Sequence, residues 1–156
     1  MTLNEDVLAY LETERAAPPE TNTGWVIDGY SLSTHPDLCD RVKQINEAAG
    51  RPATFRYLYG KPVLVAENGV IVAFAGGTYV YCVRLPRGEV DQRLVGERKE
   101  KLSEHPVLRV MELQLDALVE GDWTRIDAWA VDVPDDERLA ALAALLQRAV
   151  ENARQI

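Results

Sequence analysis

The sequence predicts an α+β fold in which helices pack on an antiparallel sheet. A meander of short strands is indicated between residues 55 and 86, where Asn68-Gly69 and Gly76-Gly77 separate apolar runs. Such pairs are the usual signal of tight hairpin turns, because both residues tolerate positive φ. Helical periodicity before and after the meander completes the order helix, three-strand meander, helix, two strands, helix, with an extra helical arm at the N-terminus.

The chain length and composition are typical of one globular domain spanning residues 1–156. With 156 residues and 47% hydrophobic content, a single domain can bury a sizeable core without disulfides or metals. The first residues are acidic where a signal peptide needs basic ones, and the longest apolar run, residues 139–146, is too short to span a bilayer. We therefore expect a soluble cytoplasmic protein that is not embedded in a membrane.

The charge balance and the cysteine content narrow the classes of partner. A formal net charge of −8 and a pI near 4.8 oppose nucleic-acid binding, which relies on Lys and Arg contacts to phosphates. Cys39 and Cys82 are too few for a disulfide framework, so we expect buried, reduced and metal-free thiols. Nucleic acid is therefore a poor candidate partner.

Residues 1–24 are predicted to form the arm. Asn4 can cap a helix that continues to about Arg15, with one apolar stripe. Pro18-Pro19 then stops regular structure and makes residues 16–24 a linker. The core is assigned to residues 33–156.

The core begins with a helix and continues into the meander. Thr34 and Asp37 form a capping box, and apolar residues follow at helical spacing until residues 50–52 end the helix. Three sequential antiparallel strands are then expected near residues 62–67, 70–75 and 78–84.

The second half of the chain contains one ambiguous segment. Residues 107–119 fit both a strand and a helix, and we favour a strand. A short helix is expected before it, over residues 88–95. Residues 123–133 alternate as a strand packed on both faces, and residues 134–154 form a final helix long enough to cross the sheet.

Several turns and apolar positions resemble a known family. The order Tyr59-Gly60, Asn68-Gly69, Gly76-Gly77 and Arg84-Leu85-Pro86 looks like the N-terminal domain of TfoX-type competence regulators. Trp123 and Trp129 before the last helix are similar to the close of that domain and of YjbR-like proteins. The resemblance covers about half the chain. It implies a two-layer domain, also seen in type III secretion chaperones, that binds proteins and has no shared catalytic residues.

Four tyrosines are the candidate interaction residues. Tyr57 and Tyr59 alternate with Phe55 to one side of their strand, as do Tyr79 and Tyr81 in theirs. One sheet face is therefore expected to be aromatic and only partly covered. The alternative is that these tyrosines complete the core with their hydroxyls at its edge.

No catalytic or cofactor site is indicated. His35 and His105 each precede a proline, and no Ser or Cys nucleophile has a base at a recognisable spacing. Together these histidines and the two cysteines have the composition of a Cys₂His₂ zinc site, but they lack the spacing along the chain that such sites show. Acids at 112, 116 and 120 would share a face of a helix, but such faces are usually solvated. We therefore expect no metal, no cofactor and no enzymatic activity.

Three functional classes are left open by the sequence. A non-catalytic regulatory or protein-interaction module is favoured. A chaperone-like binder of one specific client is the alternative, and an enzyme that binds a small ligand or a metal is the third. Because one layer of helices shields only one sheet face, the second face needs another cover. The candidates are the N-terminal helix, folding back across the Pro18-Pro19 linker, and a second copy of the chain. We expect a homodimer with Tyr79 and Tyr81 near the contact.

Overall fold

The computed structural model describes residues 4–13, 25–27, 30–32, 34–77, 79–96, 104, 106–129 and 134–156. Its helices are α1 (Glu5–Thr13), α2 (Pro36–Ala48), α3 (Pro106–Val119) and α4 (Asp135–Ala153), with short 3₁₀ turns η3 (Arg87–Glu89) and η4 (Gln92–Leu94). Its strands are β1 (Trp25–Ile27), β2 (Tyr30–Leu32), β3 (Thr54–Leu58), β4 (Lys61–Val65), β5 (Ile71–Gly76), β6 (Val80–Val83) and β7 (Thr124–Arg125). None of the helices in these residues combines the length and apolar character that a bilayer-spanning segment requires.

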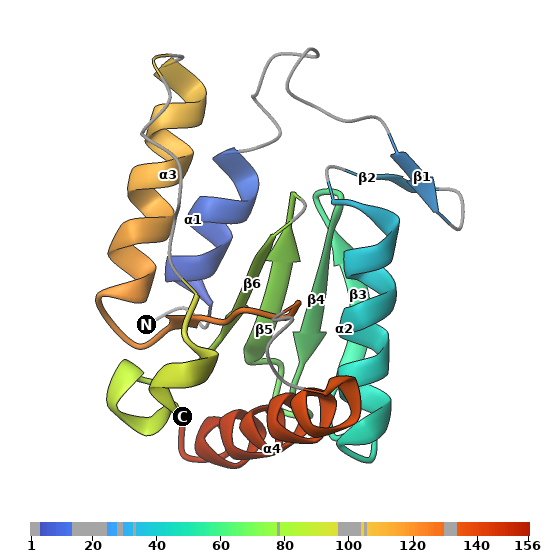
Figure 1. The fold of residues 1–156 in the computed structure, drawn as a ribbon. Coiled ribbons are helices and arrows are strands. Elements are labelled where there is room, and N and C mark those ends of the chain that lie inside the picture. Colours follow the sequence, from blue (N-terminus) through green and yellow to red (C-terminus); the bar gives the residue numbers. More distant parts are fainter. Residues whose placement is uncertain are drawn as a thin grey trace.

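The α+β prediction is confirmed by a five-stranded antiparallel sheet in the order β3-β4-β5-β6-β7 (Figure 1). The strands expected near residues 62–67, 70–75 and 78–84 are β4, β5 and β6, and they pair antiparallel in sequence order. β3 extends the meander by pairing with β4, and β7 pairs with β6. β1 and β2 form a separate hairpin.

Helices cover both faces of this sheet, so a third layer is added to the two expected. α2 and α4 lie against one face and α1 and α3 against the other (Figure 1). Val63, Phe74 and Cys82 of the strands pack with Val7 and Leu115 of the helices in the second cluster. The second face is therefore covered within the chain, by the N-terminal helix that was one of the two expected candidates and by α3.

The segment expected as a strand over residues 107–119 is the helix α3. Met111, Leu115 and Leu118 are buried at helical spacing, whereas Leu113 is 48% exposed. A strand would place Leu113 on the same face as its neighbours two positions away. Burial of the helical set against α1 and Trp123 decides between the two periods.

Two of the expected helix caps use different residues. The α2 helix is capped by His35, whose Nδ1 accepts a hydrogen bond from the Asp37 amide at 3.0 Å. Thr34, predicted as the cap, is buried and its Oγ1 donates to the Gly60 carbonyl oxygen at 3.4 Å. Asn4 has φ +67 and its side chain bonds outside its own helix.

The side chain of Asn4 joins α1 to the sheet instead of capping the helix. Its Oδ1 accepts from the Ile71 amide at 2.7 Å, and its Nδ2 donates to the Gly69 carbonyl oxygen at 2.9 Å. Beside it, Arg84 pairs with Asp6 at 3.6 Å and lies 4.6 Å from the Trp123 ring. These contacts fix the arm helix on the second sheet face.

Three further boundaries differ from the sequence prediction. The strand expected over 123–133 is limited to β7 among the described residues, and residues 130–133 lie outside them. The short helix expected over 88–95 is η3 and η4. At the Asn68-Gly69 turn only Gly69 has positive φ, because the turn is centred on residues 67–68, with the Gly69 amide donating to the Ala66 carbonyl oxygen at 2.9 Å.

Candidate interaction surface

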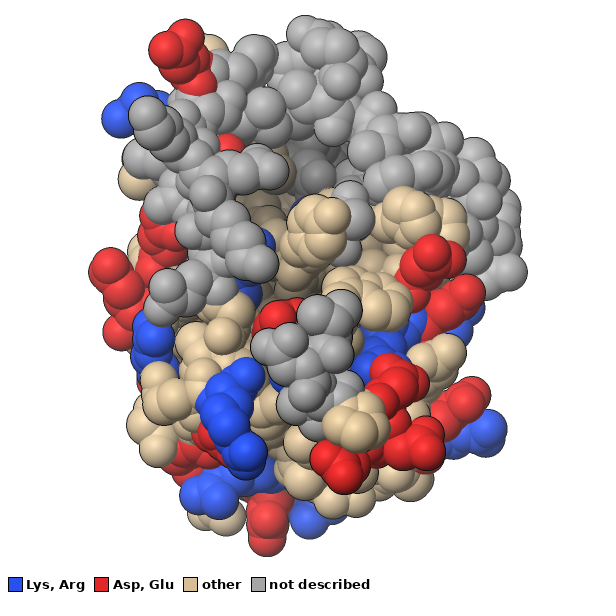
Figure 2. All heavy atoms as spheres, in the orientation of Figure 1, with Lys and Arg blue, Asp and Glu red and all other residues tan. Residues whose placement is uncertain are grey.

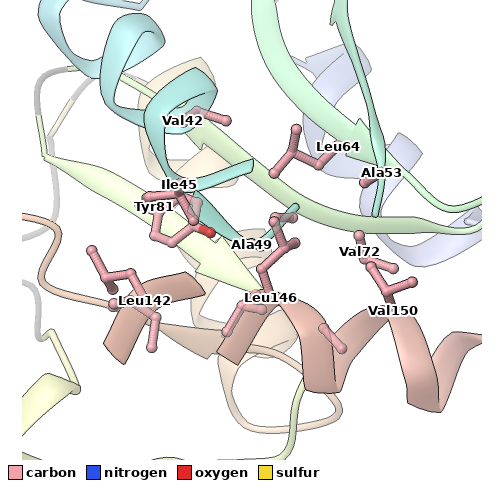
Figure 3. Close-up of a cluster of buried hydrophobic side chains, with 14 of the residues drawn as sticks. Val42, Ile45, Ala49, Ala53, Leu64, Val72, Tyr81, Leu142, Leu146 and Val150 are labelled. Atoms are coloured by element: carbon pink, nitrogen blue, oxygen red, sulfur yellow. The ribbon is translucent and has the colours of Figure 1, made fainter. Parts of the chain in front are cut away.

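The four candidate tyrosines do not share one face. Tyr81 is 1% exposed and belongs to the core under α2 and α4, where Figure 3 shows it among Ile45, Ala49 and Leu142. Its hydroxyl is buried and has no hydrogen-bond partner within the described part of the chain. The alternative reading, that tyrosines complete the core, therefore holds for Tyr81.

Tyr57 lies on the outer strand β3 beside α2. It is half-buried, and its ring meets Phe55 edge-on with centroids 5.1 Å apart. The Lys43 ammonium lies 5.8 Å from the Tyr57 ring and 5.1 Å from the Phe55 ring. This side chain is thus part of the edge of the α2 layer.

Tyr59 and Tyr79 lie at one end of the sheet, which we call the turn end: Thr34, Tyr59, Gly60, Gly77 and Tyr79. Thr34 connects the two turns, since it contacts Gly60 and forms a parallel bridge with Gly77. The next amide, of His35, donates to the Gly77 carbonyl oxygen at 2.8 Å. Tyr79 follows Gly77 by two residues, so both tyrosines belong to this end.

The backbone at the turn end adopts unusual conformations. Tyr59 has φ +53, and Gly60 and Gly77 have φ +80 and +59. A bulky residue with positive φ is strained, by on the order of 1 kcal/mol or more, and such strain is found preferentially at functional positions. The left-handed conformation also breaks the strand alternation, so Tyr59 packs against the α1 and α3 cluster while Phe55 packs on the other face.

The turn end exposes one large aromatic side chain. Tyr79 is 69% exposed, whereas Tyr59 is half-buried and its hydroxyl donates to Glu12 Oε1 of α1 at 3.1 Å. An exposed tyrosine offers apolar area together with a hydroxyl group, a composition enriched in protein-binding sites.

Lys61 adjoins this end and is not among the residues predicted from the sequence. It is 1% exposed, and its ammonium lies 5.5 Å from the Tyr10 ring, under α1. The ammonium lies close against Gly76, because a Cβ added at that position would require Lys61 Nζ to move. The register of the predicted hairpin, which pairs Val63 with Phe74, places Lys61 opposite Gly76 and is the signal that could have found it.

Burial controls ionisation around Lys61. It lowers the pKa of the Lys61 ammonium to about 7 and raises the pKa of the Cys82 thiol to about 12. Burial also raises the pKa of Tyr10; Cys82 and Glu112 add to the rise, whereas Arg125 opposes it. The amine is therefore the one group of these three that changes charge near neutral pH.

The residues of the possible Cys₂His₂ zinc site are not brought together in the described part of the chain. Cys82 belongs to the cluster under α1 and α3, Cys39 lies on α2, and His105 is outside the described residues. Both cysteines are buried free thiols, and burial raises the pKa of Cys39 to about 11. Among the described residues no group of three or more His, Cys, Asp or Glu side chains could hold a metal ion.

Charge is mixed over the visible surface. In Figure 2 the described acidic and basic side chains are interspersed, and neither sign forms a large separate area on that face.

Comparisons with known proteins leave the family open. A scan of protein-family models, a search of curated proteins and a search of solved structures each found no match. The resemblance to TfoX-type and YjbR-like proteins stays a prediction.

Proposed function

We propose that the protein is a non-catalytic regulatory module that binds another protein at the turn end of its sheet. The observation that carries the proposal is Tyr79, the most exposed of the large hydrophobic side chains among the described residues. The strained backbone of Tyr59 beside it supports the same location. A chaperone-like binder of a single client would use the surface in the same way.

The net charge and the two thiols favour a particular kind of partner and a particular cellular compartment. The net charge of −8 favours a protein over nucleic acid as partner. Two buried free thiols are typical of a reducing compartment, so the cytoplasm is the proposed location.

Site-specific photo-crosslinking tests the proposal. A photoreactive phenylalanine analogue replaces Tyr79 in cells of the source organism, and Ile156 is the matched control because it is 56% exposed at the end of α4. We expect one discrete protein adduct at position 79 and none at 156. The partner, once purified, should bind Tyr79→Ala at least about tenfold more weakly than the wild type, as expected for an aromatic hot spot. Equal binding would refute the proposal.

Lys61 is the specific observation that favours an enzyme instead. An amine with a pKa of about 7 is largely neutral at slightly alkaline pH and can attack a carbonyl carbon, losing water to form an imine. Incubation with pyruvate and borohydride, followed by peptide mass mapping, tests this alternative. Reductive labelling of Lys61 ahead of Lys43 would support it, and labelling of Lys43 alone would exclude it.

A further inference from the structure

The α3 helix has a second apolar stripe on its outer side. Its inner residues Met111, Leu115 and Leu118 are buried, but Val110 and Leu113 are each 48% exposed. Pro106 and Ala117 are also exposed and continue the stripe in both directions. In Figure 1 the helix lies at the outside of the molecule beside α1.

The spacing of the stripe is that of a helix-pairing seam. Positions 106, 110, 113 and 117 follow each other by four, three and four residues, which is the a/d spacing of a coiled coil. One face of an ordinary surface helix is apolar, whereas α3 is apolar on two roughly opposite faces. The outer seam therefore fits another helix.

We propose that the outer seam of α3 pairs antiparallel with the same seam of a second copy of this chain. Read in either direction, the seam is a small residue, two larger ones and a small residue. An antiparallel two-fold contact thus brings Val110 of one copy level with Leu113 of the other, once on each side of the two-fold axis. It also aligns the two helix dipoles favourably.

The charges beside the seam are complementary in this arrangement. Arg109 and Asp116 lie on the same flank of α3, two turns or about 10 Å apart along the axis. Antiparallel pairing places Arg109 of each copy within side-chain reach of Asp116 of the other, which makes two equivalent ion pairs. A parallel pairing would instead set identical residues level with each other.

The contact is small, so the dimer is weak. A helix of 14 residues is about 21 Å long, and two such helices bury less than the roughly 1,000 Å² of a stable interface. We expect a dissociation constant on the order of 10⁻⁵ to 10⁻⁴ M. The contact is independent of the turn end, so either proposal can fail without the other.

Sedimentation equilibrium between about 10 µM and about 1 mM tests the contact, since this range brackets the expected constant. Leu113→Glu should be monomeric throughout, and circular dichroism should show an unchanged fold because the side chain is half exposed. Tyr79→Glu is the matched control and should dimerise as the wild type does. A wild type that stays monomeric at the highest concentration would overturn the proposal.

Exchanging the two charges beside the seam distinguishes this pairing from non-specific association. Arg109→Asp should weaken the dimer, and the double variant Arg109→Asp with Asp116→Arg should restore it, because both ion pairs are then re-formed in reverse. Failure of the double variant to recover would contradict the antiparallel arrangement, as would a dimer that is lost in Tyr79→Glu but kept in Leu113→Glu.

Discussion

The strands present different chemistry on the two faces of the sheet. Toward α2 and α4 they contribute apolar side chains such as Leu64, Val72 and Val83, together with Tyr81 (Figure 3). Toward α1 and α3 they contribute a lysine, a thiol and a guanidinium, on Lys61, Cys82 and Arg84. The first face depends mainly on apolar burial, whereas the second also needs specific polar contacts.

The buried arginines near the first face lie at its borders. Arg41 and Arg138 are buried, and they donate to the backbone carbonyl oxygens of Ala128 and Asp127 at 3.3 and 2.6 Å. They anchor the chain that leads into α4, outside the apolar cluster. This difference indicates that the α2/α4 layer contributes most of the stability through apolar burial. The stability of the α1/α3 layer also depends on the charge of its polar groups.

The largest expected effect is a cavity in the α2/α4 layer. Leu146→Ala removes a side chain that is 0% exposed and should lower the free energy of unfolding by about 3 to 5 kcal/mol. Leu118→Ala, the matched change on α3, should cost about 2 kcal/mol because its side chain lies at the border of the second cluster, where a cavity can collapse. Urea titrations of both variants measure the difference. An equal or larger loss in Leu118→Ala would reverse the ranking of the layers.

The second effect is a pH dependence that belongs to the α1/α3 layer. The pKa of Lys61 is about 7 in the folded protein, whereas the ordinary value for a lysine, taken for the unfolded chain, is 10.5. Below about pH 7 both states hold the proton and the folded state carries a buried charge, whereas above it the unfolded state binds more protons, so stability rises with pH. From about pH 6 to 8.5 the wild type should gain about 2 kcal/mol relative to Lys61→Met.

Lys43→Met is the control for this measurement and should show no such gain. The upper limit of the pH range avoids the cysteines, whose pKa values of about 11 and 12 in the folded state lie above the ordinary thiol value of 9.0. Because the unfolded state loses the thiol protons first, the two cysteines lower the stability of the fold as the pH rises above 9.0. A constant difference between wild type and Lys61→Met over the range would show that Lys61 is not a buried charge at low pH.

The smallest expected effect concerns the Tyr81 hydroxyl, which β6 directs into the apolar face. Tyr81→Phe removes a buried hydroxyl with no hydrogen-bond partner among the described residues, so it should be neutral or stabilise by up to about 1 kcal/mol. Tyr59→Phe removes the bond to Glu12 and should cost up to about 1 kcal/mol. Thermal melts of the pair compare the two hydroxyls directly. Destabilisation by Tyr81→Phe would reveal a partner for that hydroxyl.

The candidate surface could be predicted only in part. Tyr59 and Tyr79 were identified from strand alternation, but the same pattern grouped them with Tyr81, which lies in the core. Alternation fixes which residues share a face and leaves open which face is covered. Val110 and Leu113 were missed because residues 107–119 were assigned to a strand, and only the helical period separates the outer seam from the inner face.

The sequence by itself determined the elements whose signals are local. Turn residues and short apolar runs set the β4-β5-β6 meander, and helical periodicity between clear stop signals set α2 and α4. Tertiary structure alone decided that α1 lies beside α3 on the second sheet face, that α3 is a helix, and that Lys61 is buried under Tyr10. The physical reason is that burial free energy depends on surfaces brought together from distant parts of the chain, which no local pattern encodes.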